Sequence, residues 1–161
     1  MDTGLREELL RRAERDQQAR AQHQPGSSGW CEVRRIDHDN TAWLDLVIDE
    51  HGWPGHALVG TEAAHAAWLL AQHADAEHQQ QWVGLLRAAV DRGEAQARDW
   101  AYLADRVETR QRRPQRFGTQ WVDTGDGRGY RLFPLVDPAQ VNTWRAEFGL
   151  PPVSGADVEV A

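Results

Sequence analysis

The residues best suited to chemistry lie in the stretch QHAD, where Gln72, His73 and Asp75 follow an apolar helical segment. An imidazole can take up and release a proton near neutral pH, and a carboxylate can hold its ring in one orientation. On a continuous helix, His73 and Asp75 would point about 200° apart, because an α-helix has 3.6 residues per turn. The two side chains can therefore cooperate only if the helix ends near Ala74.

Two interpretations of this segment stay open. In the structural one, Asp75 caps the following helix and His73 bonds the last carbonyls of its own helix. In the functional one, His73 is a general acid/base that is oriented by Asp75 or by Asp16. Sequence spacing alone does not separate the two interpretations.

A second polar group ends the apolar stripe of the first predicted helix, which covers residues 4 to 22. The stripe runs through Leu9, and its continuation reaches Asp16, Gln17 and Arg20. The apolar face of this helix therefore ends in a polar cluster.

The segment RPQRFGTQ, residues 113 to 120, is the third candidate. Gly118 permits unusual backbone angles, and the backbone amides near Thr119 could hold a carboxylate or an amide together with the side chains of Gln115 and Gln120. The structural alternative is the entry to a hairpin, where these polar side chains tie down a loop. The segment also belongs to a dense basic cluster, which either forms a solvated surface or binds an anion through its guanidinium groups. Its members are Arg110, Arg112, Arg113 and Arg116.

General catalytic and metal motifs give little further guidance. The sequence has no Gly-rich phosphate loop, no G-x-S-x-G elbow and no H-E-x-x-H pair. Histidines occur five residues apart at His73 and His78, a spacing that turns two rings to different faces of a helix. We therefore expect no metal and no organic cofactor, and we keep a metal site with His73 and Asp75 as ligands as an alternative.

Composition excludes several classes of protein. The 161 residues carry a net charge of -7, which argues against a binder of nucleic acid or of an anionic membrane. All 18 basic residues are arginine, so no side-chain amine can form a Schiff base. Cys31 is the single cysteine and cannot form an internal disulfide. The charged N-terminus does not resemble a signal peptide, and we expect a cytoplasmic protein.

The elements that must position these residues are mostly helices. Hydrophobic spacing and breaker residues predict a mainly α, single-domain bundle of about six helices with one C-terminal β-hairpin. Helices are expected over 4–22, 39–50, 61–75, around 82–92, around 100–113 and over 138–148. The hairpin is expected over 118–135, a flexible break over 24–29, an extended segment over 30–36, and a frayed tail over 151–161. Thr61 is the expected N-cap of the third helix.

Several short motifs together resemble a family of uncharacterised bacterial proteins, a domain of unknown function. They are DQQAR (16 to 20), GWPG (52 to 55), VG (59 to 60), AAWLLAQHAD (66 to 75), DRV (105 to 107) and PQRFGTQ (114 to 120). Phe117 stands where the family usually has Tyr, and Arg113 where a glycine is expected. The resemblance covers roughly residues 5 to 150 and implies no activity. It does imply a pattern rich in polar positions, which helix packing alone does not require and which favours a cleft lined by these side chains.

Three functions follow as hypotheses. The first is a small cofactor-independent enzyme of the hydrolase, cyclase, lyase or isomerase type, with His73 as general acid/base oriented by Asp75 or Asp16. Its substrate is a polar metabolite or a peptide that bears a carboxylate or an amide. The expected substrate-binding residues are Gln17, Arg20, Gln72, Gln115, Arg116, Thr119 and Gln120. The alternatives are a non-catalytic module that binds a peptide or protein in the same cleft, and a metal-dependent enzyme. The oligomeric state is not predicted.

Overall fold

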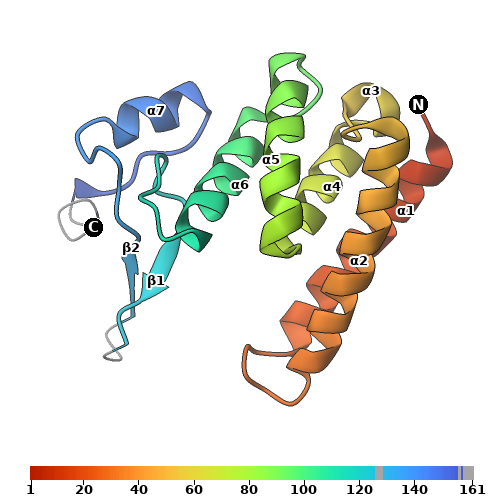
Figure 1. Cartoon of the computed structure of the whole chain (residues 1–161), viewed down its shortest axis with the longest axis horizontal. Helices are drawn as coiled ribbons and strands as arrows, with labels where there is room; N and C mark the ends of the chain where they lie inside the picture. Colours follow the sequence, from red (N-terminus) through yellow and green to blue (C-terminus); the bar gives the residue numbers. More distant parts are fainter. Residues whose placement is uncertain (126–128, 156, 158–161) are drawn as a thin grey trace. The chain divides into compact units, whose positions relative to one another are not determined.

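The computed structural model describes residues 1–125, 129–155 and 157. The chain is mainly helical with a two-stranded antiparallel hairpin near its C-terminal end, which confirms the predicted fold class (Figure 1). Two compact units are present, Met1–Gln96 and Ala97–Ala161, and each is described by itself. The expectation of a single domain stays a prediction.

The first unit is built around a pair of long antiparallel helices, α1 and α2, which lie side by side in Figure 1. Its helices are α1 (Thr3–Gln22), α2 (Trp30–His51), α3 (His56–Val59), α4 (Thr61–His73) and α5 (Ala76–Asp91). Helix α4 packs against both α1 and α2. Its buried side chains are mostly alanine, for example Ala63 and Ala67, and such small side chains let neighbouring helices approach closely.

Helix α2 begins earlier than the sequence indicated. The segment 30–36 was expected to be extended, and this prediction is wrong, because α2 is helical from Trp30 onward. Its apolar residues follow a spacing of three, and Val33 and Ile36 are buried against Ala19 of α1 with Trp30 packed beside them. Three-residue spacing places side chains on one face of a helix, whereas a strand would need alternation.

The boundary between α4 and α5 lies within QHAD, as both interpretations of that segment require. Helix α4 ends at His73, Ala74 is extended with ψ of 165°, and α5 begins at Ala76. The predicted break is therefore confirmed. At its other end, α4 begins at Thr61 but is capped by Gly60 with φ of 80°, so the expectation that Thr61 is the N-cap is wrong by one residue.

The second unit contains α6 (Ala97–Arg110), the strands β1 (Trp121–Asp123) and β2 (Tyr130–Leu132), and α7 (Val141–Glu147). The strands pair antiparallel with Val122 opposite Arg131. Residues 126–128 of the expected hairpin lie outside the described residues. Helix α7 is shorter than the predicted 138–148.

The C-terminal tail was expected to be frayed from residue 151. Val153 instead packs against the cluster of Leu132, Leu135 and Val141. Its backbone exchanges two hydrogen bonds with the side chain of Asn142, at 2.9 and 3.1 Å. Residues 156 and 158–161 lie outside the described part of the chain, where the expectation stays a prediction.

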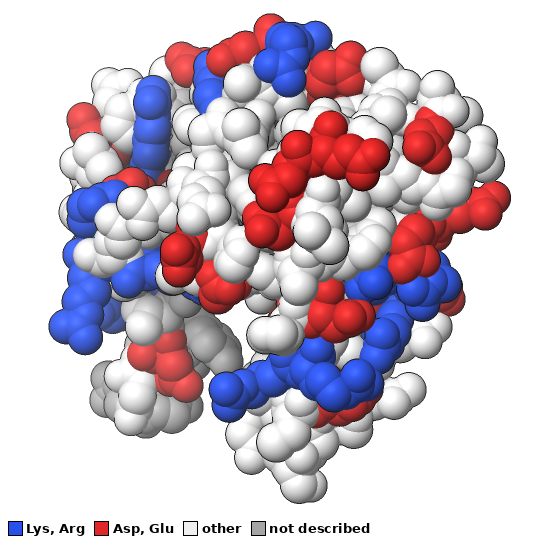
Figure 2. All heavy atoms as spheres, turned by 45° about the vertical axis from the view of Figure 1, so that its right-hand side comes forward, with Lys and Arg blue, Asp and Glu red and all other residues white. Residues whose placement is uncertain are grey.

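The surface of the first unit mixes both signs of charge. Acidic and basic side chains both gather on the face that Figure 2 shows. On α1 and α2, Arg12 pairs with Asp39 at 2.9 Å and Arg35 pairs with Glu32 at 2.7 Å. Within the described residues, no helix combines the length and the apolar character that crossing a membrane would require.

Candidate functional site

The central contact of the first unit joins a buried carboxylate on α1 to the last residue of α4. Asp16 is only 1% exposed, and its Oδ2 lies 2.9 Å from Nδ1 of His73. The packing of α1 against α4 brings the two side chains together. Of the two carboxylates proposed from sequence to orient His73, Asp16 is the one that contacts it.

Asp16 has two further donors from its own helix. Arg20, one turn later, places Nε 3.2 Å from Oδ1, and the neighbouring Gln17 donates from Nε2 to Oδ2 at 2.8 Å. Burial by itself would raise the pKa of Asp16, but the hydrogen bond and charge of His73, together with Arg20 and Gln17, hold that pKa below its usual value. Asp16 is therefore a fully ionised acceptor at neutral pH.

The guanidinium of Arg20 joins α1 to α2. Its Nη2 donates to Oδ1 of Asp37, and its Cζ lies 5.6 Å from the ring centroid of Trp30. Burial raises the pKa of Asp37, and the adjacent Arg20 opposes that effect. The cluster around His73, which consists of Asp16, Arg20, Asp37 and His73, thus contains two carboxylates and one guanidinium.

The contacts of His73 fix the position of its ring proton. A carboxylate only accepts hydrogen bonds, so Nδ1 of His73 must carry the proton at 2.9 Å from Asp16. Arg20 Nε also lies 3.2 Å from this nitrogen, but its single N–H has the stronger acceptor in the Asp16 carboxylate. With the proton on Nδ1, Nε2 is the unprotonated atom of a neutral imidazole, and no side chain in the described residues forms a hydrogen bond with it. The side chain of His73 is 20% exposed.

Asp75 has a different partner from the one that the functional interpretation allowed. Its Oδ1 accepts from the backbone N–H of His78 at 3.0 Å, and its Oδ2 lies 2.8 Å from the Nδ1 of the same residue. Asp75 is the N-cap of α5, as the structural interpretation expected. The described contacts thus assign helix capping to Asp75 and the orientation of His73 to Asp16.

Gln79 of α5 closes the end of α4. This side chain is fully buried, and its Nε2 donates to the backbone carbonyls of Ala71 and Gln72 at 3.0 and 2.8 Å. The last carbonyls of a helix have no partner within it, so an amide donor from the next helix stabilises this terminus. The structural interpretation assigned these carbonyls to His73, whereas Gln79 bonds them in the structure. Gln79 thereby fixes the turn from which His73 projects.

Two residues of the cluster were missed by the sequence analysis. Asp37 lies in the part of α2 next to the segment expected to be extended, so its place beside α1 was not visible. Gln79 lies four residues after Asp75, about one helical turn beyond the N-cap of α5, and this spacing was a usable signal.

Gln72 was predicted to bind substrate. It is 4% exposed, and no described group hydrogen-bonds its Nε2. A buried amide donor without a partner is uncommon in proteins and marks a position that can bind a further acceptor.

The remaining predicted binding residues lie together in the second unit, where they support the loop that enters the hairpin. Gln115 is fully buried, and its Nε2 donates to the carbonyls of Gln120 and Phe133, both at 2.8 Å. Its Oε1 accepts from the backbone N–H of Gln120 at 2.8 Å. These bonds are those expected of the structural alternative, in which polar side chains tie down a loop.

Asp105 of α6 holds the same loop through its carboxylate. Its carboxylate accepts from the backbone N–H groups of Arg116, Phe117 and Thr119 and from the Thr119 hydroxyl, at 2.9 to 3.1 Å. Burial raises the pKa of Asp105 against these four donors. The exposed guanidinium of Arg116 stacks 4.6 Å from the ring centroid of Trp144. Both donors of Thr119 are therefore used by Asp105, whereas the guanidinium of Arg116 still offers N–H groups to an anion.

The carboxylates around His73 also bear on the metal alternative. Asp16, Asp37 and His73 each offer a ligand atom, and these atoms lie within 4.8 Å of one another. Asp75, the expected ligand, is not part of this group. Arg20 bonds to Asp16 and Asp37 and lies beside His73. Its guanidinium therefore already supplies the positive charge that a metal ion would bring to these three residues. These donors fit a metal ion only if Arg20 withdraws.

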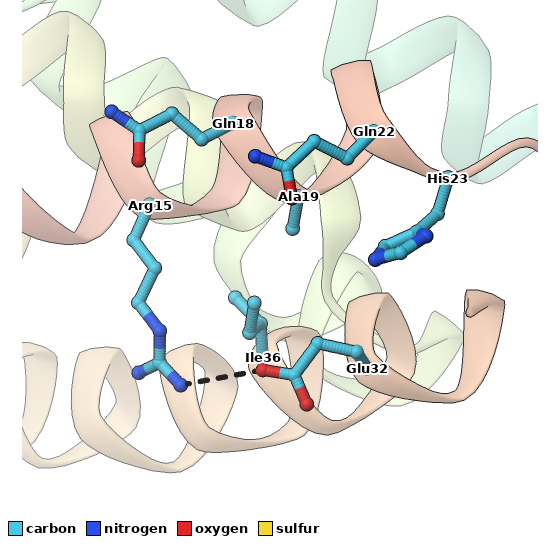
Figure 3. A pocket seen from close by; sticks show the side chains of 7 residues that line it. All are labelled: Arg15, Gln18, Ala19, Gln22, His23, Glu32 and Ile36. Atoms are coloured by element: carbon cyan, nitrogen blue, oxygen red, sulfur yellow. Dashed lines mark ion pairs between the residues drawn. The ribbon is translucent and has the colours of Figure 1, made fainter.

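A separate hollow of about 170 Å³ lies between α1 and α2 (Figure 3). Ala19 and Ile36 lie at its apolar base, and Arg15 and Glu32 face each other across it at 3.9 Å. On α1, Arg15 projects to a different face from Asp16, because successive helical residues are turned by 100°. This hollow is therefore distinct from the cluster around His73.

Replacing Gln79 with methionine should destabilise the chain. Gln79→Met keeps the side-chain volume but leaves the carbonyls of Ala71 and Gln72 without donors, at a cost of about 1–3 kcal/mol. Denaturant unfolding followed by circular dichroism measures this cost. Gln80→Met, at the exposed neighbouring position, is the matched control and should change the unfolding free energy by less than about 0.5 kcal/mol. Equal effects of the two substitutions would contradict the role assigned to Gln79.

The contribution of Asp16 to stability should depend on pH. Its folded pKa is lowered, so its ionised form stabilises the fold above the unfolded pKa of about 3.9, and this stabilisation is lost as pH falls through the folded pKa. Asp16→Asn should therefore cost about 1–3 kcal/mol at neutral pH, and the gap from the wild type should shrink below about pH 4. Urea unfolding at several pH values measures the gap. A gap that stays constant from neutral to acidic pH would count against an ionised Asp16.

Comparison with known proteins gives one match. No curated protein and no solved structure matches the chain. A family model, described as a family of unknown function (DUF6624), matches residues 3–157. This match confirms the resemblance to an uncharacterised family, whereas the short signatures stay predictions. Since the match covers nearly the whole chain, the protein belongs to the DUF6624 family of unknown function.

Proposed function

We propose that the chain is a small acid–base enzyme in which His73 moves a proton to and from the substrate. The observation that carries the proposal is the contact between Nδ1 of His73 and the buried carboxylate of Asp16, at 2.9 Å. A carboxylate behind an imidazole sets its tautomer and stabilises the imidazolium that forms when the ring accepts a proton. The outer nitrogen, Nε2, is then the base.

The proposed chemistry needs only this proton transfer and a polarised substrate group. His73 Nε2 takes a proton from the substrate or from a water molecule, and the imidazolium later returns it to the leaving or rearranged group. Hydrolysis, cyclisation, elimination and isomerisation are all compatible with this cycle. The reaction as proposed uses no organic cofactor.

One group beside the histidine supports a polar substrate that bears an amide or a carboxylate. The unpartnered Nε2 of buried Gln72, one residue before His73, can donate to a substrate carbonyl. Arg20 is held by Asp16 and Asp37, so it orients the site more than it binds anions. Arg116 lies in the second unit and is not assigned to this site. The substrate is proposed to be a metabolite or a peptide and not a nucleic acid or a membrane, and a cytoplasmic location stays a prediction.

Two alternatives keep specific support. The grouping of Asp16, Asp37 and His73 within 4.8 Å favours a metal-dependent enzyme if Arg20 is displaced. The exposed aromatic residues Trp121 and Tyr130, which are 44% and 72% exposed, favour a non-catalytic module that binds a peptide or protein.

A screen of polar metabolites and short peptides tests the proposal. The wild type should convert at least one compound, and His73→Ala should lower the rate by about 10²- to 10⁴-fold, as expected for loss of a general acid/base. His78→Ala is the matched control, because His78 contacts the capping residue Asp75 and should leave the rate nearly unchanged. Turnover that survives His73→Ala would contradict the proposal. Turnover that a chelator abolishes and a divalent metal restores would favour the metal-dependent alternative.

A further inference from the structure

We propose that the hollow between α1 and α2 binds a small carboxylate with a short apolar chain, and that Arg15 holds its charged end. The hollow is separate from the cluster around His73, so the inference goes beyond the proposed function and does not depend on it. It follows from an arginine whose hydrogen-bonding groups are unused and from the apolar base of the hollow.

The guanidinium of Arg15 lies near two carboxylates and forms a hydrogen bond with neither. Its Nη2 is 3.9 Å from Oε1 of Glu32, and its Nη1 is 3.7 Å from Oδ2 of Asp39. Both distances exceed the reach of a hydrogen bond. No group in the described part of the chain hydrogen-bonds to Arg15, whose side chain is 36% exposed. Its N–H groups are therefore available to a ligand.

Other arginines already bind these two carboxylates. Glu32 accepts from Nε and Nη2 of Arg35, at 3.0 and 2.7 Å. Asp39 accepts from Nη1 of Arg12 at 2.9 Å. An acceptor supplied by a ligand would give Arg15 the paired hydrogen bonds that guanidinium groups form with oxoanions.

The ion-pair network that contains Arg15 has an excess of positive charge. Within the described residues it connects Arg11, Arg12, Arg15 and Arg35 with Glu8, Glu32 and Asp39. The hydrogen bonds from Arg11 and Arg35 lower the pKa values of Glu8 and Glu32, so both are ionised at neutral pH. Arginine stays protonated in proteins, and one positive charge of the network is therefore uncompensated. A bound carboxylate neutralises it.

A second donor lies on the same face of α1. Gln22 follows Arg15 by seven residues, a spacing that places two side chains on one face of a helix. Its amide has no hydrogen-bond partner among the described residues and lies around the same hollow, which His23 bounds at one end (Figure 3). Gln18, by contrast, donates to Glu14 at 3.0 Å. Gln22 can therefore share the anion with Arg15.

The base and the size of the hollow favour a short apolar chain on the anion. Ala19 and Ile36 form the base and are 8% and 2% exposed. The volume of about 170 Å³ is roughly that of five to six water molecules, which suits a small metabolite and not a polymer. Each CH₂ group buried on this base should tighten binding by up to about fourfold. Phosphate would pair with Arg15 but leave the base uncovered.

Four small probes test the inference. They are butyrate, acetate, phosphate and butyramide, which is the neutral counterpart of butyrate. Each is titrated into the full chain near pH 7 at constant ionic strength, and the backbone amide signals of Ala19 and Ile36 are followed by NMR. We expect butyrate to bind saturably in the millimolar range, about threefold or more tighter than acetate and phosphate and about tenfold or more tighter than butyramide. The net charge of -7 repels anions from most of the surface, so a saturable response reports a local site.

Substitution at Arg15 locates the binding. Arg15→Gln should weaken butyrate binding by about tenfold or more. Arg34→Gln is the matched control, because it removes the same charge from an exposed position on α2 that does not line the hollow, and it should leave the affinity within about twofold. His73→Ala should also retain the affinity. If Arg15→Gln does not fold, the ranking of the four probes on the wild type still decides the question.

Several results would overturn the inference. They are the lack of a saturable response to butyrate, butyramide binding as tight as that of butyrate, tighter binding of phosphate or acetate than of butyrate, or equal weakening in Arg15→Gln and Arg34→Gln. Loss of butyrate binding in His73→Ala would also overturn it, because the carboxylate would then bind at the cluster around His73. None of these results bears on turnover by His73, which the proposed function predicts separately.

Discussion

The buried carboxylate of Asp16 is the constraint on which the rest of the site depends. A charge removed from water is costly unless donors replace the solvent that it has lost. Asp16 is 1% exposed, and its donors come from His73 of α4 and from Arg20 and Gln17 of α1. Because one donor belongs to another helix, the packing of α1 against α4 and the position of the histidine are linked. A shift of α4 along α1 would leave the carboxylate without this donor.

Two further contacts, one from α2 and one from α5, hold that arrangement. On α2, Asp37 and the ring of Trp30 fix the guanidinium of Arg20, so that it stays beside Asp16. On α5, Gln79 bonds the last carbonyls of α4 and keeps its final turn in place. Neither contact involves Nε2 of His73, the proposed proton acceptor. Both limit how far the imidazole can move, which is how a scaffold preorganises a reactive group.

Much of the helical framework was predictable from sequence, because periodic apolar residues and breakers such as Gly93 report on burial and chain direction directly. The break after His73 was also predictable, because Asp75 is a favoured N-cap residue for a following helix. The choice between Asp16 and Asp75 was not. It depends on which helix packs beside the end of α4, a long-range contact that local spacing does not encode. Asp37 was missed for a related reason, because the start of α2 was read as extended.

The PQRFGTQ segment shows a second limit of prediction from sequence, which concerns the role of polar residues and not their position. Gln115, Thr119 and Gln120 were grouped correctly, but their bonds to the backbone and to Asp105 show that loop support accounts for most of their polar atoms. Side-chain type and spacing look the same whether an amide binds a loop or a ligand. Only the unused hydrogen-bonding capacity distinguishes the two cases. Around His73 such capacity remains at Gln72 and Asp37.

The most direct test of the account is the tautomer of His73, measured by nitrogen-15 NMR of the imidazole at a pH where the ring is neutral. The account predicts a protonated Nδ1 bonded to Asp16 and an unprotonated Nε2, with the preference weakened in Asp16→Asn. A ring protonated at Nε2 with a bare Nδ1 would contradict it, because Asp16 could not then be the partner that orients the base.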